Sequence, residues 1–181
     1  MPKLDADIAR LEDVDLTGAD IERISGYGVN VYTYEQLPSF DSIDELLGSK
    51  KATVILYQTE KQYGHWVLLF ENTSGDTPHI EFFDSLGWEP DSELKLSEYN
   101  IKQHRGEIVP YLSYLISRSA LKVKYNNYPL QKFARHVNTC GRWCAIRALW
   151  RHVPLNEFVA MFSNNKEYPP DFWVSALTFL L

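Results

Sequence analysis

The stretch Asn138–Arg147 constrains the fold of this chain more than any other part of the sequence. It reads Asn-Thr-Cys-Gly-Arg-Trp-Cys-Ala-Ile-Arg, and Asn or Thr directly before an apolar run is typical of a helix N-cap. Cys140 is therefore expected at, or just inside, the N-terminus of a helix. Trp143, Cys144 and Ile146 make this helix so apolar that we expect it to be buried at the centre of the domain.

A cysteine at the start of a helix has particular chemistry. The positive end of the helix dipole and the unpaired backbone N–H groups favour a thiolate over a thiol. The same N–H groups can donate to an oxyanion, and Gly141 keeps a side chain from blocking the approach of a substrate. Cys140 is thus a candidate nucleophile and Gly141 a candidate substrate-binding residue. This stretch alone fits a small, inert, buried cysteine equally well.

Two other stretches bear on that choice. Tyr63–Phe70 reads as a strand with His65 near its start, and His79–Gly87 reads as the next strand, with Asp84 before a glycine turn. Adjacent antiparallel strands would place His65 and Asp84 side by side. A cysteine nucleophile needs this pair, because the imidazole takes the thiol proton and the carboxylate orients the imidazole.

Each of these residues also has an ordinary explanation when taken alone. His65 could be a half-buried histidine of the sheet, and Asp84 could serve only to form the turn. The three residues together, each in the context that catalysis requires, favour a catalytic site made of His65, Asp84 and Cys140.

The motifs Gly64-His65-Trp66, Phe83-Asp84-Ser85 and Thr139-Cys140-Gly141 resemble, in this order, the adenain and ubiquitin-like-protein-specific protease superfamily. The order of His, Asp and Cys along the chain is permuted relative to papain. The surrounding sequence is most similar to adenain-like proteases of virophages, Polinton elements and large DNA viruses. The resemblance spans roughly residues 53–162 and, more faintly, residues 16–47.

The resemblance implies two further site residues. The family uses a glutamine upstream of the cysteine as an oxyanion donor, and Gln131 is the candidate here. Because Gln131 is further from Cys140 than is usual, segment 132–137 must bulge out; Asn138 or backbone donors are the alternative. A tryptophan after the histidine helps to form a narrow tunnel for small substrate residues in the family. Trp66 is therefore expected to bind substrate as well as to pack in the core.

The expected fold is α+β, with a central antiparallel sheet that carries His65 and Asp84 and packs on the Cys140 helix. We predict a single cysteine protease domain over residues 1–181, with an N-terminal arm (1–50), a catalytic core (51–162) and a C-terminal helix (163–181). Residues 90–100 are expected to form a polar connection. The other expected elements are a short or frayed helical arm over 1–15, helices over 17–24, 43–47, 107–117, 155–162 and 171–181, and strands over 29–34, 53–57 and 121–125.

Composition excludes several classes of protein. With 181 residues and 45% hydrophobic content, the chain can fill one core, and it has no apolar run of about 18 residues and no signal peptide. We therefore expect a soluble, intracellular protein with no membrane partner. Two cysteines one helical turn apart do not form a disulfide framework.

The net charge of −6 is unevenly distributed. Residues 1–100 carry 7 basic and 20 acidic side chains, whereas residues 101–181 carry 11 and 4. The basic residues of the second half could form a basic face near the Cys140 helix, or dock on the acidic half, or simply be solvated, and we favour the last two. The candidates for such a face are Lys122, Lys124, Lys132, Arg135, Arg142, Arg147 and Arg151.

The resemblance implies a cysteine endopeptidase that cleaves viral precursor proteins, such as capsid proteins, at glycine-containing sites during virion maturation. It would act in the host cytoplasm or a virus factory, or packaged in the virion. We expect no metal and no cofactor; an activating peptide is compatible with the family, and DNA activation is disfavoured by the net charge. The alternatives are a deubiquitinase or ubiquitin-like-protein protease and, more remotely, a metal-stabilised binding module using Cys140, Cys144 and His136 or His152.

Overall fold

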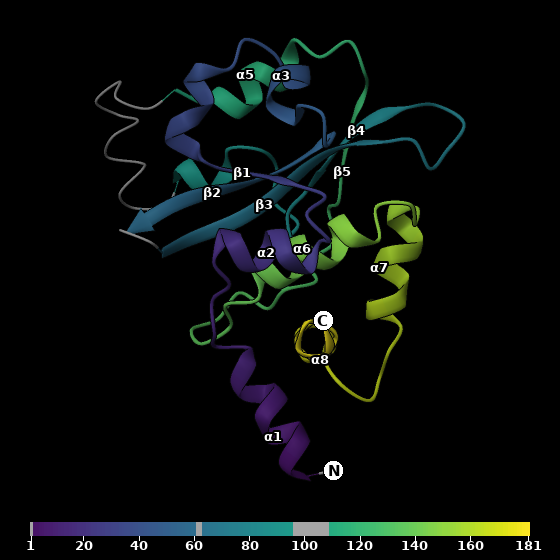
Figure 1. Ribbon diagram of the computed structural model, residues 1–181. Helices are drawn as coiled ribbons and strands as arrows, with labels where there is room; N and C mark the ends of the chain where they lie inside the picture. Colours follow the sequence, from purple (N-terminus) through teal and green to yellow (C-terminus); the bar gives the residue numbers. More distant parts are fainter. Residues whose placement is uncertain (1, 61–62, 96–108) are drawn as a thin grey trace.

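The structure, a computed structural model, describes residues 2–60, 63–95 and 109–181. Its centre is a five-stranded sheet with the strand order β1-β2-β3-β4-β5 (Figure 1). The strands are β1 (Asn30–Thr33), β2 (Ala52–Glu60), β3 (Tyr63–Asn72), β4 (His79–Phe83) and β5 (Val123–Tyr125).

The predicted α+β class is confirmed, but the sheet is mixed rather than antiparallel. The three central strands are antiparallel, as expected, whereas β1 pairs in parallel with β2 and β5 pairs in parallel with β4. The edge strands reach the sheet through helical or long connections, and such connections permit parallel pairing. Leu68 lies opposite Phe83, so Asp84, one residue past the end of β4, comes diagonally close to His65.

Helices cover both faces of the sheet (Figure 1). The 3₁₀ helix η1 and helices α3 and α5 lie on one face, and α2, α6, α7 and α8 lie on the other, while α1 extends away from the sheet. Their bounds, with those of the short 3₁₀ helix η2, are α1 (Pro2–Leu11), α2 (Gly18–Ile24), η1 (Tyr34–Ser39), α3 (Ile43–Leu47), η2 (Ser92–Lys95), α5 (Tyr111–Ser117), α6 (Cys140–Leu149), α7 (Leu155–Ser163) and α8 (Pro170–Leu180).

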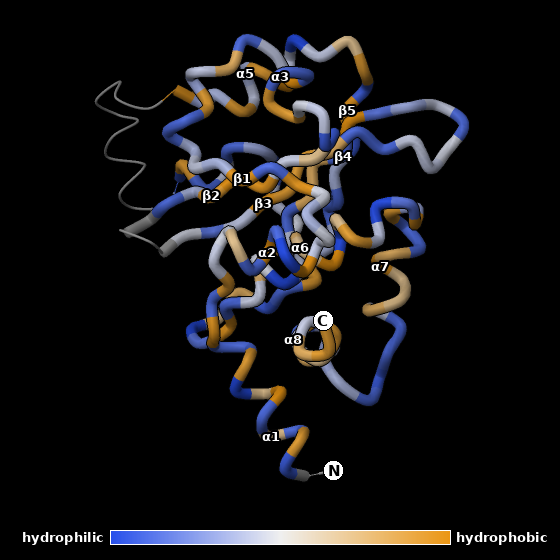
Figure 2. Tube along the Cα trace, viewed as in Figure 1, coloured by the Kyte–Doolittle hydropathy of each residue, from blue (hydrophilic) through white to orange (hydrophobic). Residues whose placement is uncertain are grey.

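Strand β3 separates two hydrophobic cores. Because side chains alternate along a strand, Trp66 and Leu68 pack with the α6 helix, whereas Val67 and Leu69 pack with the α3 and α5 side. Helix α6 is buried over almost its whole length, as its apolar sequence predicted. Figure 2 shows the mostly apolar α8 next to it, in contrast to the mixed polar and apolar α1.

The short N-terminal helices follow their capping signals. The Thr17 hydroxyl accepts from the Asp20 N–H and the Asp20 carboxylate accepts from the Thr17 N–H, which makes a complete capping box for α2. Ser42 caps α3 at the Glu45 N–H, but the Glu45 carboxylate accepts from Asp41 rather than from Ser42. Both helices start where the sequence predicted.

Two expected elements differ from the structure. The region predicted as a polar connection, 90–100, contains η2, which buries Glu93 and Leu94, and its residues 96–100 lie outside the described chain. The predicted helix 107–117 is described from Tyr111, because Pro110 serves as its N-cap; its residues 107 and 108 also lie outside the described chain. Among the described helices, none is long and apolar enough to cross a membrane.

Candidate active site

Helix α6 begins at Cys140, as predicted, but its start has no side-chain cap. Thr139 occupies the N-cap position, yet its hydroxyl donates to the Asp171 carboxylate of α8 instead of accepting from the helix. The Trp143 indole also donates to Asp171. The N–H groups of the first turn are therefore left without a capping side chain, and Cys140 stands among them.

The second cysteine of the helix is in a different environment. Cys144 is fully buried one turn further on, where its Sγ donates to the Trp66 carbonyl at 3.4 Å. Burial raises the pKa of the Cys144 thiol well above its ordinary value, and the charges of Cys140 and Asp84 add to this. Cys144 therefore has the character of a packing residue.

His65 and Asp84 are hydrogen bonded, as the strand pattern predicted. His65 Nε2 lies 2.8 Å from Asp84 Oδ1, which also accepts from the Leu86 N–H at 2.7 Å. Asn126 holds the Asp84 backbone from both sides: its Oδ1 accepts from the Asp84 N–H at 3.0 Å and its Nδ2 donates to the Asp84 carbonyl at 2.6 Å. The carboxylate is thus fixed relative to the sheet.

His65 and Asp84 each stabilise the charged form of the other, which shifts the pKa of both groups. Burial works to lower the pKa of His65, but the charge and hydrogen bond of Asp84, with a hydrogen bond to Cys140, raise it well above the ordinary value. Burial works to raise the pKa of Asp84, and the His65 imidazolium overcomes this and lowers it. Since Nε2 is held by Asp84, Nδ1 is the ring nitrogen left for Cys140. His65 can therefore exchange a proton with the thiol.

Gln131 is held in the same region by three hydrogen bonds. Its backbone N–H donates to the Ser85 carbonyl, the Ser85 hydroxyl donates to its Oε1 at 2.7 Å, and its Nε2 donates to the Val137 carbonyl at 3.0 Å. The last bond closes the predicted bulge over 132–137, in which His136 adopts a left-handed φ of 64°. One N–H of the amide remains for another acceptor.

Trp66 and Gly141 were both predicted to bind substrate, and their surroundings differ: Trp66 lines a cavity, whereas Gly141 is packed against other elements. Trp66 packs in the core and its indole donates to the Leu16 carbonyl, and the same ring lines a cavity. Gly141 lines none of the cavities described here. A Cβ at Gly141 would lie 3.1–3.3 Å from Leu16, Ile21 and Trp66, so close packing of α6 favours the glycine. Its role in binding substrate stays a prediction.

Glu93 of η2 is a site residue that the sequence analysis did not identify. Its carboxyl group is fully buried, with Oε1 3.7 Å from His65 Nε2. His65, Asp84 and Glu93 together bring one nitrogen and two carboxyl groups within 4.8 Å of one another. A metal ion there would compete for the nitrogen that Asp84 holds, so we interpret the cluster as part of the acid–base machinery.

Three cavities meet at the candidate site. A central cavity of about 200 Å³ is lined by His65, Gln131 and Cys140. It shares Asp15 and Gly64 with a cavity of about 500 Å³, the Trp66 cavity. It also shares lining residues with a cavity of about 790 Å³, the Phe133 cavity; the shared residues are Leu86, Trp88, Gln131, Lys132, Phe133 and Val137. The three cavities are therefore neighbours, and Cys140 lines the central one; we refer to the three together as the groove.

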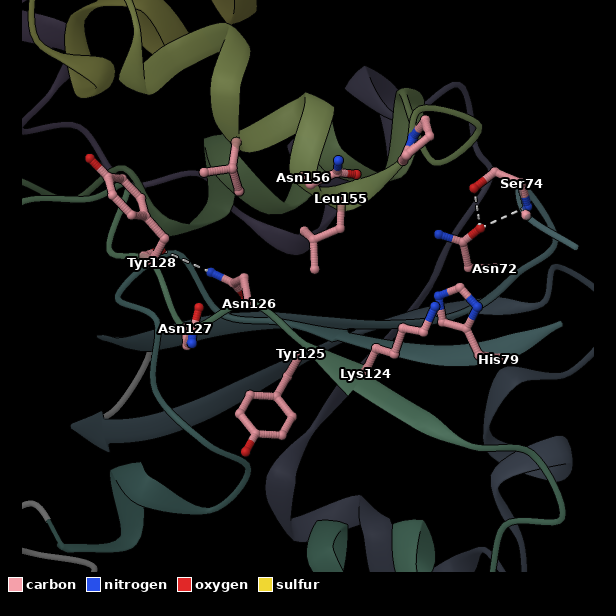
Figure 3. A pocket seen from close by; sticks show the side chains of 13 residues that line it. Asn72, Ser74, His79, Lys124, Tyr125, Asn126, Asn127, Tyr128, Leu155 and Asn156 are labelled. Carbon is pink, nitrogen blue, oxygen red and sulfur yellow. Dashed lines mark hydrogen bonds between the residues drawn. The ribbon is translucent and has the colours of Figure 1, made fainter. Parts of the chain in front are cut away.

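A fourth cavity, of about 520 Å³, lies at the β5 edge of the sheet against α7 (Figure 3). It is lined by polar side chains such as Asn72, His79 and Lys124, and by Leu155 and Asn156 of α7. Neither His65 nor Cys140 lines it. Asn126 connects its wall to the Asp84 backbone, so this cavity lies behind the site rather than in it.

The basic face near α6, which the sequence analysis named as the less favoured possibility, is interrupted. Arg147 is fully buried against Glu81, and Arg142 is buried with one donor on the Thr178 hydroxyl, so neither faces a polyanion. The metal-module alternative also finds no support in the described chain, where the group of candidate ligands contains no cysteine. His136 instead lies 3.1 Å from Asp13.

Comparison with known proteins gives one sequence relative and a shared fold. The chain is 34% identical to protein V9 of the Sputnik virophage over 170 residues, which cover 92% of this chain and 95% of V9, whose name states no activity. The solved structure of the ASFV pS273R protease matches with a TM-score of 0.53 at 15% identity, covering 95% of this chain and 69% of the protease. A selenomethionine structure of the same protease gives a TM-score of 0.50 with 70% of it covered. No family model matches the sequence.

Proposed function

Because this chain belongs to the same family as the Sputnik virophage protein V9 and has the fold of a viral protease, we propose that it is a cysteine endopeptidase. Cys140 is the nucleophile, His65 is the acid–base residue and Asp84 orients His65. The single observation that carries the proposal is the His65–Asp84 pair, bonded at 2.8 Å, beside Cys140 in the middle of a groove.

The reaction proceeds through an acyl-enzyme. His65 Nδ1 takes the Cys140 proton as Sγ bonds to the substrate carbonyl carbon, and the carbonyl electrons move to its oxygen. The C–N bond then breaks as His65 protonates the leaving amine. His65 next takes a proton from water, whose oxygen attacks the thioester and releases the acid product and Cys140.

The oxyanion is stabilised by two kinds of donor. The first turn of α6 carries backbone N–H groups with no capping side chain, and the Gln131 amide has an N–H left over. Gln131 lines the cavity around Cys140, and α6 begins at Cys140, so both kinds of donor lie at this cavity. Donors that are fixed before the reaction stabilise the developing negative charge without reorganisation.

The groove supports an endopeptidase rather than an exopeptidase. An internal peptide bond needs space for chain on both sides of the cleaved bond, and the Trp66 and Phe133 cavities adjoin the Cys140 cavity through different lining residues. An endopeptidase, unlike an exopeptidase, does not need to recognise a terminus of its substrate. The Phe133 ring, 73% exposed and 5.4 Å from the Trp88 ring, offers an apolar wall to one half of the substrate.

Viral structural precursors, capsid proteins among them, are the proposed substrates, cleaved at glycine-containing sites. Kinship with a virophage protein supports the viral context. Trp66, with its indole held by the Leu16 carbonyl, lines the cavity next to that of Cys140, and its ring is proposed to favour substrate residues without side chains.

Thiol labelling tests the nucleophile. A peptide probe with a thiol-reactive group should modify Cys140, and Cys140→Ala should abolish both labelling and cleavage. Cys144→Ala is the matched control, because Cys144 is buried one turn away, and it should keep most of the activity. An active Cys140→Ala protein, or equal labelling of both cysteines, would contradict the assignment.

A side-by-side rate measurement tests the substrate class. A glycine-containing peptide from a viral capsid precursor should be cleaved without DNA, and ubiquitin fusions should be cleaved poorly or not at all. Duplex DNA should change neither rate at low or moderate salt, because Arg147 and Arg142 are buried. Efficient ubiquitin cleavage would instead assign the chain to the deubiquitinases.

A further inference from the structure

Glu93 places a second buried carboxyl group against the His65–Asp84 pair. It is fully buried on η2, and within the described part of the chain neither of its oxygens has a hydrogen-bond partner when both acids are counted as ionised. Asp84 Oδ2 has none either. Three carboxylate oxygens without a donor, in one place, are costly in a folded protein and need an explanation.

A neighbour on the same segment shows that donors are not generally lacking there. Asp91, two residues earlier and also buried, accepts from the Tyr34 hydroxyl at 2.7 Å, the Tyr57 hydroxyl at 2.9 Å and the Ser113 N–H at 2.7 Å. Tyr57 is thereby committed to Asp91 and is not available to Glu93. The deficit is specific to the Glu93–Asp84 contact.

The charges around Asp84 and Glu93 favour a proton shared between these two acids. Among the residues that the structure describes, only His65 offers a positive charge to them, while Asp84 from the β4 end and Glu93 from η2 would both be negative. Burial raises the pKa of Glu93 well above its ordinary value against the opposing charge of His65, and the contact with Asp84 raises it further. One proton on Glu93 would give Asp84 Oδ2 its missing donor.

We propose that Glu93 is a positioning residue of the catalytic site: a carboxylic acid that donates to Asp84 Oδ2 and so holds Oδ1 on His65 Nε2. The proposal rests on the proposed function and extends the triad by one residue. Asp84 then has fixed bonds on both oxygens, to His65 and Leu86 on one and to Glu93 on the other.

Ionisation of Glu93 would add a second negative charge 3.7 Å from His65 Nε2. That charge would hold the imidazolium proton more strongly, and His65 would protonate the leaving amine less readily. The described titratable groups facing Glu93 are His65, Asp84 and Tyr57, with Asp91 behind Tyr57. The proposal therefore predicts an alkaline decline in activity that depends on Glu93.

The test compares Glu93→Gln with Glu93→Leu. The Gln amide still donates to Asp84 at every pH, so Glu93→Gln should keep kcat within a few-fold and lose the alkaline decline. Glu93→Leu removes the donor and should lower kcat roughly 10- to 100-fold with little change in KM, the size seen when a residue that orients a site is removed. Glu89→Gln, an exposed glutamate nearby, is the matched control and should behave as wild type.

A second measurement separates this proposal from the proposed function. Infrared difference spectra of the full chain at neutral pH should contain a band of a protonated carboxylic acid that Glu93→Gln removes and Glu89→Gln keeps. This readout needs no activity and no correctly folded Leu variant. Absence of the band, an unchanged alkaline decline in Glu93→Gln, or a divalent ion that purifies with wild type and not with Glu93→Gln would overturn the proposal.

Discussion

Two buried charged clusters lie on the same sheet and differ in how completely their hydrogen bonds are formed. In the first, Arg147 Nε and Nη2 donate to the two Glu81 oxygens at 2.7 and 2.8 Å, and Asn72 donates to Glu81 as well. Arg147 Nη1 donates to the carbonyls of Trp150 and Val153. Both Glu81 carboxylate oxygens and all three Arg147 guanidinium nitrogens therefore have hydrogen-bond partners.

In the second cluster, His65 with Asp84 and Glu93, the described residues leave three oxygens without a donor when both acids are ionised. Its two acids, Asp84 and Glu93, are as deeply buried as Glu81 and Arg147, so the burial of the acids does not distinguish the two clusters. We infer from this difference that the saturated cluster serves the fold, whereas the unsaturated cluster, whose His65 lines the cavity around Cys140, serves proton exchange.

Asp84→Asn should give the largest effect and break the second cluster only. An amide cannot stabilise the imidazolium of His65, so kcat should fall by on the order of 10²–10⁴ while the fold is retained. Peptidase rates together with urea unfolding measure the two quantities separately. Near-normal turnover would mean that another group holds His65.

Arg147→Met should have the opposite effect: it should lower the stability of the fold and leave activity nearly unchanged. It leaves Glu81 buried without its counter-ion, which should lower the free energy of unfolding by about 3–5 kcal/mol. Activity per folded molecule should be nearly unchanged, because Arg147 lies away from the groove. Urea unfolding and active-site titration of the folded fraction check both parts.

A double variant provides the control for this interpretation. Replacing both members, Glu81→Leu with Arg147→Met, removes the unpaired charge and should recover most of the stability that Arg147→Met loses. No apolar pair at positions 84 and 93 should recover activity in the same way. If the double variant is as unstable as Arg147→Met, the Glu81–Arg147 pair itself stabilises the fold, and the loss in Arg147→Met is not explained by an unpaired Glu81 charge alone.

Asn72→Ala should sharpen the comparison with a smaller effect. Asn72 Nδ2 donates to Glu81 Oε2 at 2.8 Å, and its removal leaves that oxygen with Arg147 alone. The free energy of unfolding should fall by about 1–3 kcal/mol, with kcat and KM unchanged. A change in kcat of more than a few-fold would show that the first cluster influences the site.

Local signals predicted the elements and most of the site. Thr17 and Ser42 marked helix starts, and the N-terminal position of Cys140 followed from Asn138 and Thr139. His65 and Asp84 came together because two adjacent antiparallel strands were recognisable from their alternation. These features depend on residues close in sequence or on strand neighbours.

The features that sequence could not predict depend on distant packing. Glu93 stands in a polar stretch, and its local sequence is that of a surface acid although the side chain is buried. Arg147 reads as a solvated base until its partner Glu81, 66 residues away, is known. Likewise Gly141 is explained by the proximity of Leu16 and Ile21, and not by the helix that contains it.

The smallest predicted effect is on the pH dependence of stability, and its sign follows from the direction of one shift. The pKa of Glu93 is raised in the folded chain by burial and by Asp84. The folded state therefore binds its proton more tightly than the unfolded state, and the stabilisation is complete below the ordinary pKa, about 4.5. It is lost as pH rises through the folded-state value.

Glu93→Gln removes this pH dependence and leaves Glu81 and Arg147 untouched. The free energy of unfolding of wild type, relative to Glu93→Gln, should be constant below about pH 4.5 and should decline steadily above it. Urea unfolding at a series of pH values measures the difference, and Glu89→Gln should follow wild type throughout. A difference independent of pH would mean that Glu93 is ionised in the folded chain, and the second cluster would then hold two negative charges beside one imidazolium.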